Sequence, residues 1–349
     1  MARGRAAVAE APGRTQAPAR PDRGSRAPLW GPTRQHVLDL DDFTAEEIDH
    51  ILRSADGMDE VLSRSVRKTP TLRGKTIITL FYEASTRTRV SFEQAAKVLG
   101  ADVINVAASG SSVSKGESLL NTVRTLQAMH VDVLVMRHPH SGAPYFVASN
   151  VDASVVNAGD GAHAHPTQAL LDLYTIRRHL GSIAGKRVAI IGDVLYSRVA
   201  RSDLWGLQKM GAEVVVCGPP TLLPLDLRPG AAPTEGSAFN GVTSVSRVEE
   251  AVEGADVVMM LRIQRERQDR GHLPDLREYS KLYGINAARL KLAKPGALLM
   301  HPGPMNEGVE ISSEVAHGAQ AVIEEQVANG VAVRMAVLYA LCARTKAVT

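Results

Sequence analysis

The feature that most constrains the fold is a regular alternation of two sequence patterns from His36 onward. Short runs of β-branched and aliphatic residues, typical of buried strands, lie at 76–81, 103–106, 131–136, 154–157, 187–191, 213–217, 256–261 and 297–300. Helical stretches lie between most of these runs, at 91–99, 119–129, 167–179 and 199–210. This alternation favours parallel sheets joined by right-handed crossovers. We therefore predict an α/β protein with doubly wound parallel sheets and helices on both faces.

The length of the chain predicts two such sheets. A chain of 349 residues exceeds the usual size of one domain, and its 44% hydrophobic content is enough to bury a core in each half. The helical stretch at about 168–179 is the best candidate for the link between the two sheets. Residues 36–168 are then expected to form one domain and 169–324 a second, linked by helices. A C-terminal helix at about 325–345 is expected to pack back on the first domain.

Residues 1–35 differ from the rest of the chain because they are rich in Ala, Arg, Pro and Gly and show no hydrophobic period. We predict a disordered tail. An organelle transit peptide is the alternative, although the many prolines argue against the amphipathic helix that such a peptide forms. The folded body is expected to open with a helix, since Thr44 and Glu47 have the spacing of a capping box.

Charge and cysteine content exclude several classes of protein. The tail carries seven arginines against two acidic residues, a net charge of +5, whereas the remainder holds 33 basic and 35 acidic residues, a net charge of −2. The body therefore gives no reason to expect a nucleic-acid partner. Cys217 and Cys342 lie in no metal-ligand spacing and are expected to be reduced. No apolar run reaches the ~20 residues of a membrane span, and no secretory signal is present, so we predict a cytoplasmic protein without a membrane partner.

Polar side chains follow six of the predicted strands. They are found in Glu83 to Arg89, Arg137-His138, Gly159 to Gln168, Gly192 to Arg198, Arg262 to Gln264, and His301 to Pro304. In open α/β sheets, ligands bind at the carboxyl ends of the strands. Six strand ends that supply Arg, His, Gln or Thr to one edge therefore indicate a binding site for a polar, anionic ligand.

The segment Ser85-Thr86-Arg87-Thr88-Arg89 is the most informative of these strand ends. Ser85 or Thr86 can cap the helix that follows, and the amino end of a helix offers unpaired N–H groups and a partial positive charge to an anion. The guanidinium of Arg87 adds a fork that can hold two phosphate oxygens. The alternative is an ordinary capped helix with two solvated arginines. The other polar strand ends favour a phosphate site.

Other polar residues near the strand ends admit simpler interpretations. His138 and His301 each precede a proline and are candidates for structural roles. Arg198 and Arg201 are both plausible ligands by charge, whereas Arg265 and Arg267 lie in a polar run typical of solvated or ion-paired residues. A nucleotide-binding fold would suit the Gly192-Asp193 turn, but the sequence contains neither G-x-G-x-x-G nor a Walker lysine.

The segment 81–93, FYEASTRTRVSFE, resembles the carbamoyl-phosphate signature of the aspartate/ornithine carbamoyltransferase family. The resemblance extends from His36 to about Leu341, and several separated motifs agree in order. It implies that 36–168 is a carbamoyl-phosphate-binding domain and 169–324 an aspartate-binding domain. It also implies a transfer of the carbamoyl group that needs no cofactor and no metal.

The resemblance assigns the site residues as follows. Phosphate would be held by Ser85, Thr86, Arg87 and Thr88, with Arg87 also assisting the departure of phosphate. Donors to the carbamoyl oxygen would be Thr88, Arg137 and His165, and acceptors for the carbamoyl NH2 would be Gln168 and the backbone carbonyls around Gly303 and Pro304. The carboxylates of the second substrate would be bound by Arg198, Arg262 and Gln264. Arg87, Thr88, Arg137 and His165 would be the catalytic residues.

The acceptor that we expect is L-aspartate, in the pyrimidine pathway. Ornithine-specific members of the family usually carry a cysteine in the His-x-x-Gln motif and a His-Cys-Leu-Pro segment, whereas this chain has His165-Pro-Thr-Gln168 and His301-Pro-Gly-Pro304. Arg262 would also repel the cationic side chain of ornithine. An ornithine-specific or other amine-specific carbamoyltransferase is the first alternative, and a non-catalytic scaffold of the same fold is the second.

The resemblance further implies that the site is shared between subunits. Ser112 and Lys115 would lie on a loop donated by a neighbouring chain, with Lys115 reaching the aspartate site, so a homotrimer is the expected minimum assembly. Some relatives have two adjacent lysines in this loop, whereas this chain has only Lys115. A regulatory chain or a dihydroorotase could join the trimer, and the sequence does not indicate which.

Overall fold

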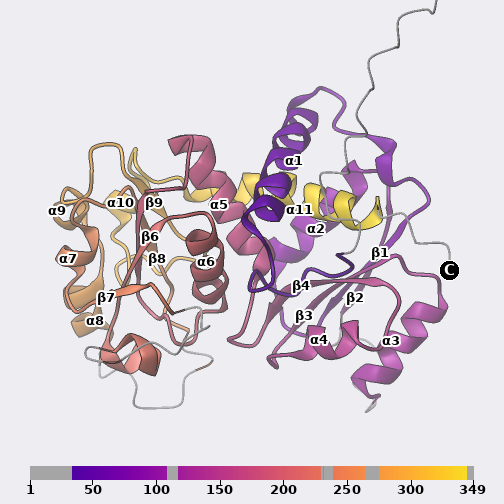
Figure 1. Cartoon of the computed structure of the whole chain (residues 1–349), viewed down its shortest axis with the longest axis horizontal. Helices are drawn as coiled ribbons and strands as arrows, with labels where there is room; N and C mark the ends of the chain where they lie inside the picture. The colour runs from indigo at the N-terminus through magenta and orange to yellow at the C-terminus, as the bar shows by residue number, and fades with distance from the viewer. Residues whose placement is uncertain are drawn as a thin grey trace, which may run out of the picture.

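The structure is a computed structural model that describes residues 34–107, 117–228, 231, 239–264, 267 and 275–343. It confirms an α/β protein with two parallel sheets (Figure 1). Ser112 and Lys115 lie outside the described residues.

The first sheet has the strand order β2-β1-β3-β4, and all its strands are parallel. Its strands are β1 (Thr76–Phe81), β2 (Asp102–Ala107), β3 (Val133–His138) and β4 (Ser154–Asp160). Successive residues of β1 point to opposite faces, so Ile77 packs toward α1 (Ala45–Ser63) and α2 (Thr86–Val98). Ile78 packs on the other face toward α3 (Leu119–Ala128) and α4 (Ala143–Ala148). Both faces are therefore buried, as the continuous apolar runs predict.

The second sheet has the order β7-β6-β5-β8-β9 and is also parallel throughout. Its strands are β5 (Arg187–Ile191), β6 (Glu213–Cys217), β7 (Thr243–Val245), β8 (Val257–Met260) and β9 (Leu298–Met300). One face packs against α5 (Pro166–Leu180) and α6 (Arg198–Lys209). The other packs against α7 (Val248–Val252), α9 (Ala287–Leu290) and α10 (Ser313–Ala316), while α8 (Leu276–Tyr283) lies near the carboxyl end of β5. The pattern did not predict β7, a three-residue edge strand in which Thr243 is exposed and the other two residues are partly buried.

Two helices join the halves of the molecule. The helix α5 follows the first sheet, and α11 (Ile323–Cys342) follows the second and returns to pack against α1, α2 and α5 (Figure 1). Because α11 is buried on nearly every side, Val333 and Leu338 belong to one continuous core with β1 and β5. This shared core brings the carboxyl ends of the two sheets to the same cavity.

The folded body begins earlier than the composition predicts. Arg34 and Gln35 fall within the predicted tail, yet the Arg34 guanidinium forms ion pairs with Asp42 (2.8 Å) and Glu47 (3.0 Å). The Gln35 side chain donates to the carbonyl of Asp152 at 2.9 Å. The Thr44–Glu47 capping box is confirmed, and Arg34 packs over the Phe43 ring beside it. These contacts place Arg34 and Gln35 in the folded body rather than in the predicted tail.

Candidate active site

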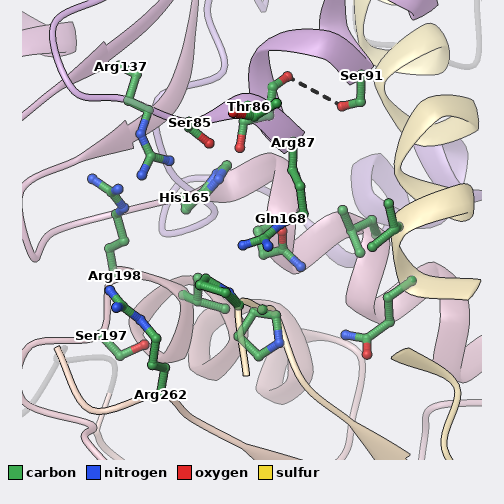
Figure 2. Close-up of a pocket in the computed structure, with 18 of the residues that line it drawn as sticks. Ser85, Thr86, Arg87, Ser91, Arg137, His165, Gln168, Ser197, Arg198 and Arg262 are labelled. Atoms are coloured by element: carbon green, nitrogen blue, oxygen red, sulfur yellow. Dashed lines mark hydrogen bonds between the residues drawn. The ribbon is translucent and has the colours of Figure 1, made fainter. Parts of the chain in front are cut away.

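A cavity of about 380 Å³ lies between the carboxyl ends of the two sheets. This is a volume typical of sites for small molecules. Every predicted binding residue in the described part of the chain lines it, namely Ser85, Thr86, Arg87, Thr88, Arg137, His165, Gln168, Arg198, Arg262, Gln264, Gly303 and Pro304. Figure 2 shows Arg87, Arg137 and His165 on one side of this space and Arg198 and Arg262 on the other.

The amino end of α2 lines the first-sheet side of the cavity. Ser85 is the N-cap residue, but its hydroxyl accepts no hydrogen bond from the helix backbone. The helix has 13 residues and begins at Thr86, so its first N–H groups and its dipole are directed toward the cavity. Arg87 packs against Gly303, where a Cβ atom would lie 3.2 Å from the guanidinium carbon. Burial and the nearby Arg262 lower the pKa of Arg87.

A cluster of three arginines surrounds Glu83, the second residue after β1. One carboxylate oxygen of Glu83 lies 2.5 Å from Nη2 of Arg137, 2.5 Å from Nη2 of Arg198 and 3.4 Å from Nη2 of Arg267. Burial alone would raise the pKa of Glu83, but the three arginines lower it. The pairing joins residues from both halves of the molecule, and it confirms the ion-paired interpretation of Arg267.

Backbone carbonyls help to orient two of these arginines. Arg137 donates to the carbonyl of Ala158 at 3.2 Å, and Arg198 donates to that of Gly161 at 3.3 Å. Gly159 has φ = +115°, and a Cβ atom there would lie 2.8 Å from the Arg198 guanidinium, so this close approach requires glycine. Burial and the neighbouring Arg198 lower the pKa of Arg137 to about 10, which leaves it cationic at neutral pH.

His165 lies at the start of α5 and is 4% exposed. Its backbone N–H donates to Ser202 Oγ at 2.9 Å, and that hydroxyl donates to Asp39 at 2.6 Å. Its Nδ1 has no hydrogen-bond partner in the described chain. Burial, followed by the charges of Arg137, Arg198, Arg334 and Arg267, lowers its pKa well below the ordinary value. His165 is therefore a neutral imidazole at neutral pH that can present one N–H to a ligand.

The second-sheet side of the cavity is formed by the loop after β8. Arg262 donates to the side-chain oxygen of Gln264 at 3.0 Å, and the backbone N–H of Gln264 donates to Asp193 at 3.0 Å. Asp193 is fully buried and also accepts from the backbone of Tyr196. The Gly192-Asp193 turn thus anchors the two loops that carry Arg198 and Arg262.

Several alternatives left open by the sequence can now be decided. His301 accepts from the N–H of Gly303 at 2.8 Å and faces Glu310 at 3.2 Å, so it shapes the Gly303–Pro304 turn while also lining the cavity. His138 accepts from the N–H of His140 and does not line the cavity. Arg201 lies over the ring of Phe239, also outside the lining.

Among the charged and amide side chains that line the cavity, the sequence pattern assigned no binding role to Glu83, Arg267, Gln326 and Arg334. Glu83 and Arg267 lie near strand ends and could have been inferred from charge. Gln326 and Arg334 are on α11, far from any strand end, and only the tertiary packing of that helix brings them to the cavity. In the described part of the chain, no group of three or more His, Cys, Asp or Glu residues could hold a metal ion, and no helix is long and apolar enough to cross a bilayer.

The sequence matches two domain profiles of one family. Residues 35–178 match the carbamoyl-P binding domain of aspartate/ornithine carbamoyltransferase, and residues 184–341 match its Asp/Orn binding domain. The chain belongs to this family. The first match ends within α5, the helix that joins the two sheets, and the second begins just after that helix.

Individual relatives of this carbamoyltransferase agree with the family match. The aspartate carbamoyltransferase catalytic subunit of Roseiflexus castenholzii is 59% identical over 308 residues, which cover 88% of this chain and 95% of the relative. Trypanosoma cruzi aspartate transcarbamoylase, solved in complex with N-(phosphonacetyl)-L-aspartic acid, has a TM-score of 0.79 and 32% identity, with 88% and 95% of the two chains covered. Pyrococcus furiosus ornithine carbamoyltransferase has a TM-score of 0.76 and 29% identity, with 89% and 98% covered.

Proposed function

We propose that this chain transfers the carbamoyl group of carbamoyl phosphate to the amino group of L-aspartate, giving N-carbamoyl-L-aspartate and phosphate, in the synthesis of pyrimidines. The observation that carries the proposal is one cavity in which cationic and amide side chains from both sheets face each other. Such a cavity can hold two anionic substrates side by side. Holding two reactants in this way lowers the barrier by several kcal/mol.

The first-sheet side of the cavity supports binding of carbamoyl phosphate. The amino end of α2 and the Arg87 guanidinium supply N–H donors to the phosphate oxygens, and the same contacts stabilise the phosphate as it leaves. The side-chain NH2 of Gln168 donates to Asp172 at 3.2 Å, which leaves its oxygen to accept from the carbamoyl NH2. The carbonyls around Gly303 and Pro304 are proposed to accept from the same group.

The transfer step needs donors where negative charge develops. When the amine attacks the carbamoyl carbon, the carbonyl oxygen becomes an oxyanion, and the proposed donors to it are Thr88, Arg137 and His165. Arg137 is held by Glu83 and Ala158, so it is oriented before the substrate arrives. Preorganised donors of this kind each contribute on the order of 100-fold or more to the rate.

The second-sheet side supports a dicarboxylate acceptor. Arg198, Arg262 and Gln264 present cationic and amide groups to the cavity, and these would bind the two carboxylates of L-aspartate. The fold itself does not select the acceptor, because the ornithine carbamoyltransferase of P. furiosus has a similar fold. The high identity to aspartate carbamoyltransferase catalytic subunits favours aspartate.

The proposed assembly is a homotrimer in which Ser112 and Lys115 of one chain complete the site of its neighbour. This proposal rests on the family resemblance of the loop that contains them. A regulatory chain or a dihydroorotase partner, and a cytoplasmic location, remain predictions from the sequence.

The proposed activity is tested by supplying purified protein with carbamoyl phosphate and either L-aspartate or L-ornithine. We expect release of phosphate and formation of N-carbamoyl-L-aspartate, identified by mass, with turnover at least about 100-fold faster than with ornithine, because Arg262 would repel the ornithine ammonium. Formation of citrulline at the higher rate would refute the acceptor assignment. Absence of turnover with either amine would refute the proposed function.

A further inference from the structure

Two buried carboxyl groups lie beneath the cavity, and the reaction as described does not use them. Asp172 on α5 and Asp203 on α6 are each 1% exposed and lie within hydrogen-bonding reach of each other. Neither oxygen of Asp203 receives a hydrogen bond from another group in the described chain. Two adjacent buried carboxylates cannot both ionise without a large cost, so such a pair holds one proton between them.

The surroundings of the two carboxyl groups differ, and the difference favours the proton on Asp203. Burial, and then the neighbouring Asp172, raise the pKa of Asp203 well above its ordinary value. Burial raises the pKa of Asp172 to about 7, although hydrogen bonds from Gln326 and Gln168 and the charge of Arg334 oppose that rise. Because Asp172 already accepts from the NH2 groups of Gln168 and Gln326, whereas the Asp203 oxygens accept from no group in the described chain, the shared proton is best placed on Asp203, which then donates to Asp172.

Asp172 accepts from side chains on two different elements of the site. The Gln168 NH2 lies 3.2 and 3.3 Å from its two oxygens, and the Gln326 NH2 lies 2.7 Å from one of them. The oxygen of Gln326 in turn accepts from the backbone N–H of His301 at 2.9 Å, where the turn to Gly303 and Pro304 begins. One carboxylate thus connects α5, α11 and the turn after β9.

This arrangement determines which end of the Gln168 amide faces the cavity. An acceptor-only partner binds the NH2 group, so the oxygen of Gln168 is directed to the other side. A partner that could donate would allow the amide to rotate and to present its NH2 to the cavity. Two NH2 groups, one from Gln168 and one from a carbamoyl ligand, would then face each other without a hydrogen bond between them.

We propose that Asp172, with the shared proton of Asp203, is a positioning residue that fixes the Gln168 amide and the turn at Gly303, and so makes the cavity selective for the carbamoyl end of carbamoyl phosphate. The inference rests on the proposed function and deepens it. It predicts that Asp172 affects recognition of the carbamoyl group and leaves recognition of the phosphate group unchanged.

The test compares Asp172→Asn with the matched control Asp203→Asn. For each variant and the wild type, dissociation constants for carbamoyl phosphate and for inorganic phosphate are measured separately at pH 7.5 without an acceptor. We expect Asp172→Asn to raise the dissociation constant for carbamoyl phosphate by about tenfold or more, because the new amide can donate to Gln168. The dissociation constant for inorganic phosphate should change by less than about twofold. Asp203→Asn should leave both constants within about threefold, since its NH2 replaces the shared proton.

The inference would be overturned if folded Asp172→Asn bound both ligands more weakly by the same factor. It would also be overturned if this variant bound both ligands as tightly as the wild type. An effect of Asp203→Asn as large and as selective as that of Asp172→Asn would also overturn it. If Asp172→Asn does not fold, the double variant with Asp203→Asn carries no buried carboxylate at this position and should show the same selective loss. A wild type that binds neither ligand would refute the proposed function instead, so the two failures are distinguishable.

Discussion

Replacement of Arg87 by alanine is expected to lower kcat/KM for carbamoyl phosphate by a factor of about 1,000 or more. Arg87 presents a cationic pair of donors to the cavity beside the amino end of α2, and under the proposed function its contribution would grow as negative charge accumulates on the departing phosphate. Its loss would remove the two charge-assisted hydrogen bonds that we propose for the transition state. The residual N–H groups of the helix can still bind phosphate weakly.

The measurement is steady-state release of phosphate at saturating L-aspartate, with thermal unfolding of each variant as the check on folding. Arg87→Lys is the matched comparison because it keeps the charge and loses the planar fork. We expect it to recover only a small part of the lost rate. If the Arg87→Ala variant kept at least a tenth of the wild-type kcat/KM, the proposed role of Arg87 in phosphate binding would be contradicted.

Replacement of Arg198 by alanine is expected to raise KM for L-aspartate by a factor of about 100 or more. Arg198 is 3% exposed, reaches the cavity from the second sheet, and is held in place by Glu83 and the carbonyl of Gly161. A bidentate contact to a carboxylate from such a position contributes roughly 3 kcal/mol, which corresponds to that factor. The dissociation constant for carbamoyl phosphate should change far less, because Arg198 lies on the acceptor side.

Arg201→Ala is a close control, because Arg201 lies on the same helix three residues further on and stacks over Phe239 outside the cavity. Its KM for L-aspartate should stay within about threefold of the wild type, even if its stability falls. Similar KM values for the two variants would show that Arg198 acts through general folding. They would leave the acceptor carboxylates without their proposed partner.

The sequence predicts this fold well where the local pattern and the tertiary environment agree. The strands at Thr76–Phe81, Arg187–Ile191 and Glu213–Cys217 are observed with the predicted bounds, because strands buried on both faces read as continuous apolar runs. The sequence does not predict the short strand β7, because its three residues lie at a sheet edge, none of them is fully buried, and they form no such run. Arg34 was assigned to the tail by composition, although its ion pairs form across the capping box of α1.

The site is predictable to the extent that its residues follow strands. Arg137, His165, Arg198 and Arg262 meet in one cavity because parallel strands all present their carboxyl ends to the same edge. Gln326 and Arg334 follow no strand. They line the cavity only because α11 packs back across the first half of the molecule. The role proposed for Asp172 was likewise invisible in the sequence, since it depends on which groups surround a buried carboxylate.

The central claim is that one cavity holds the phosphate of one substrate and the carboxylates of the other at the same time. Calorimetric titration with N-(phosphonacetyl)-L-aspartic acid tests this most directly, because that compound joins a phosphonate to L-aspartate in one molecule. We predict one molecule bound per chain, at least about 100-fold more tightly than inorganic phosphate, with the advantage lost in both Arg87→Ala and Arg198→Ala. Binding no tighter than that of inorganic phosphate, or unchanged by Arg198→Ala, would contradict the account.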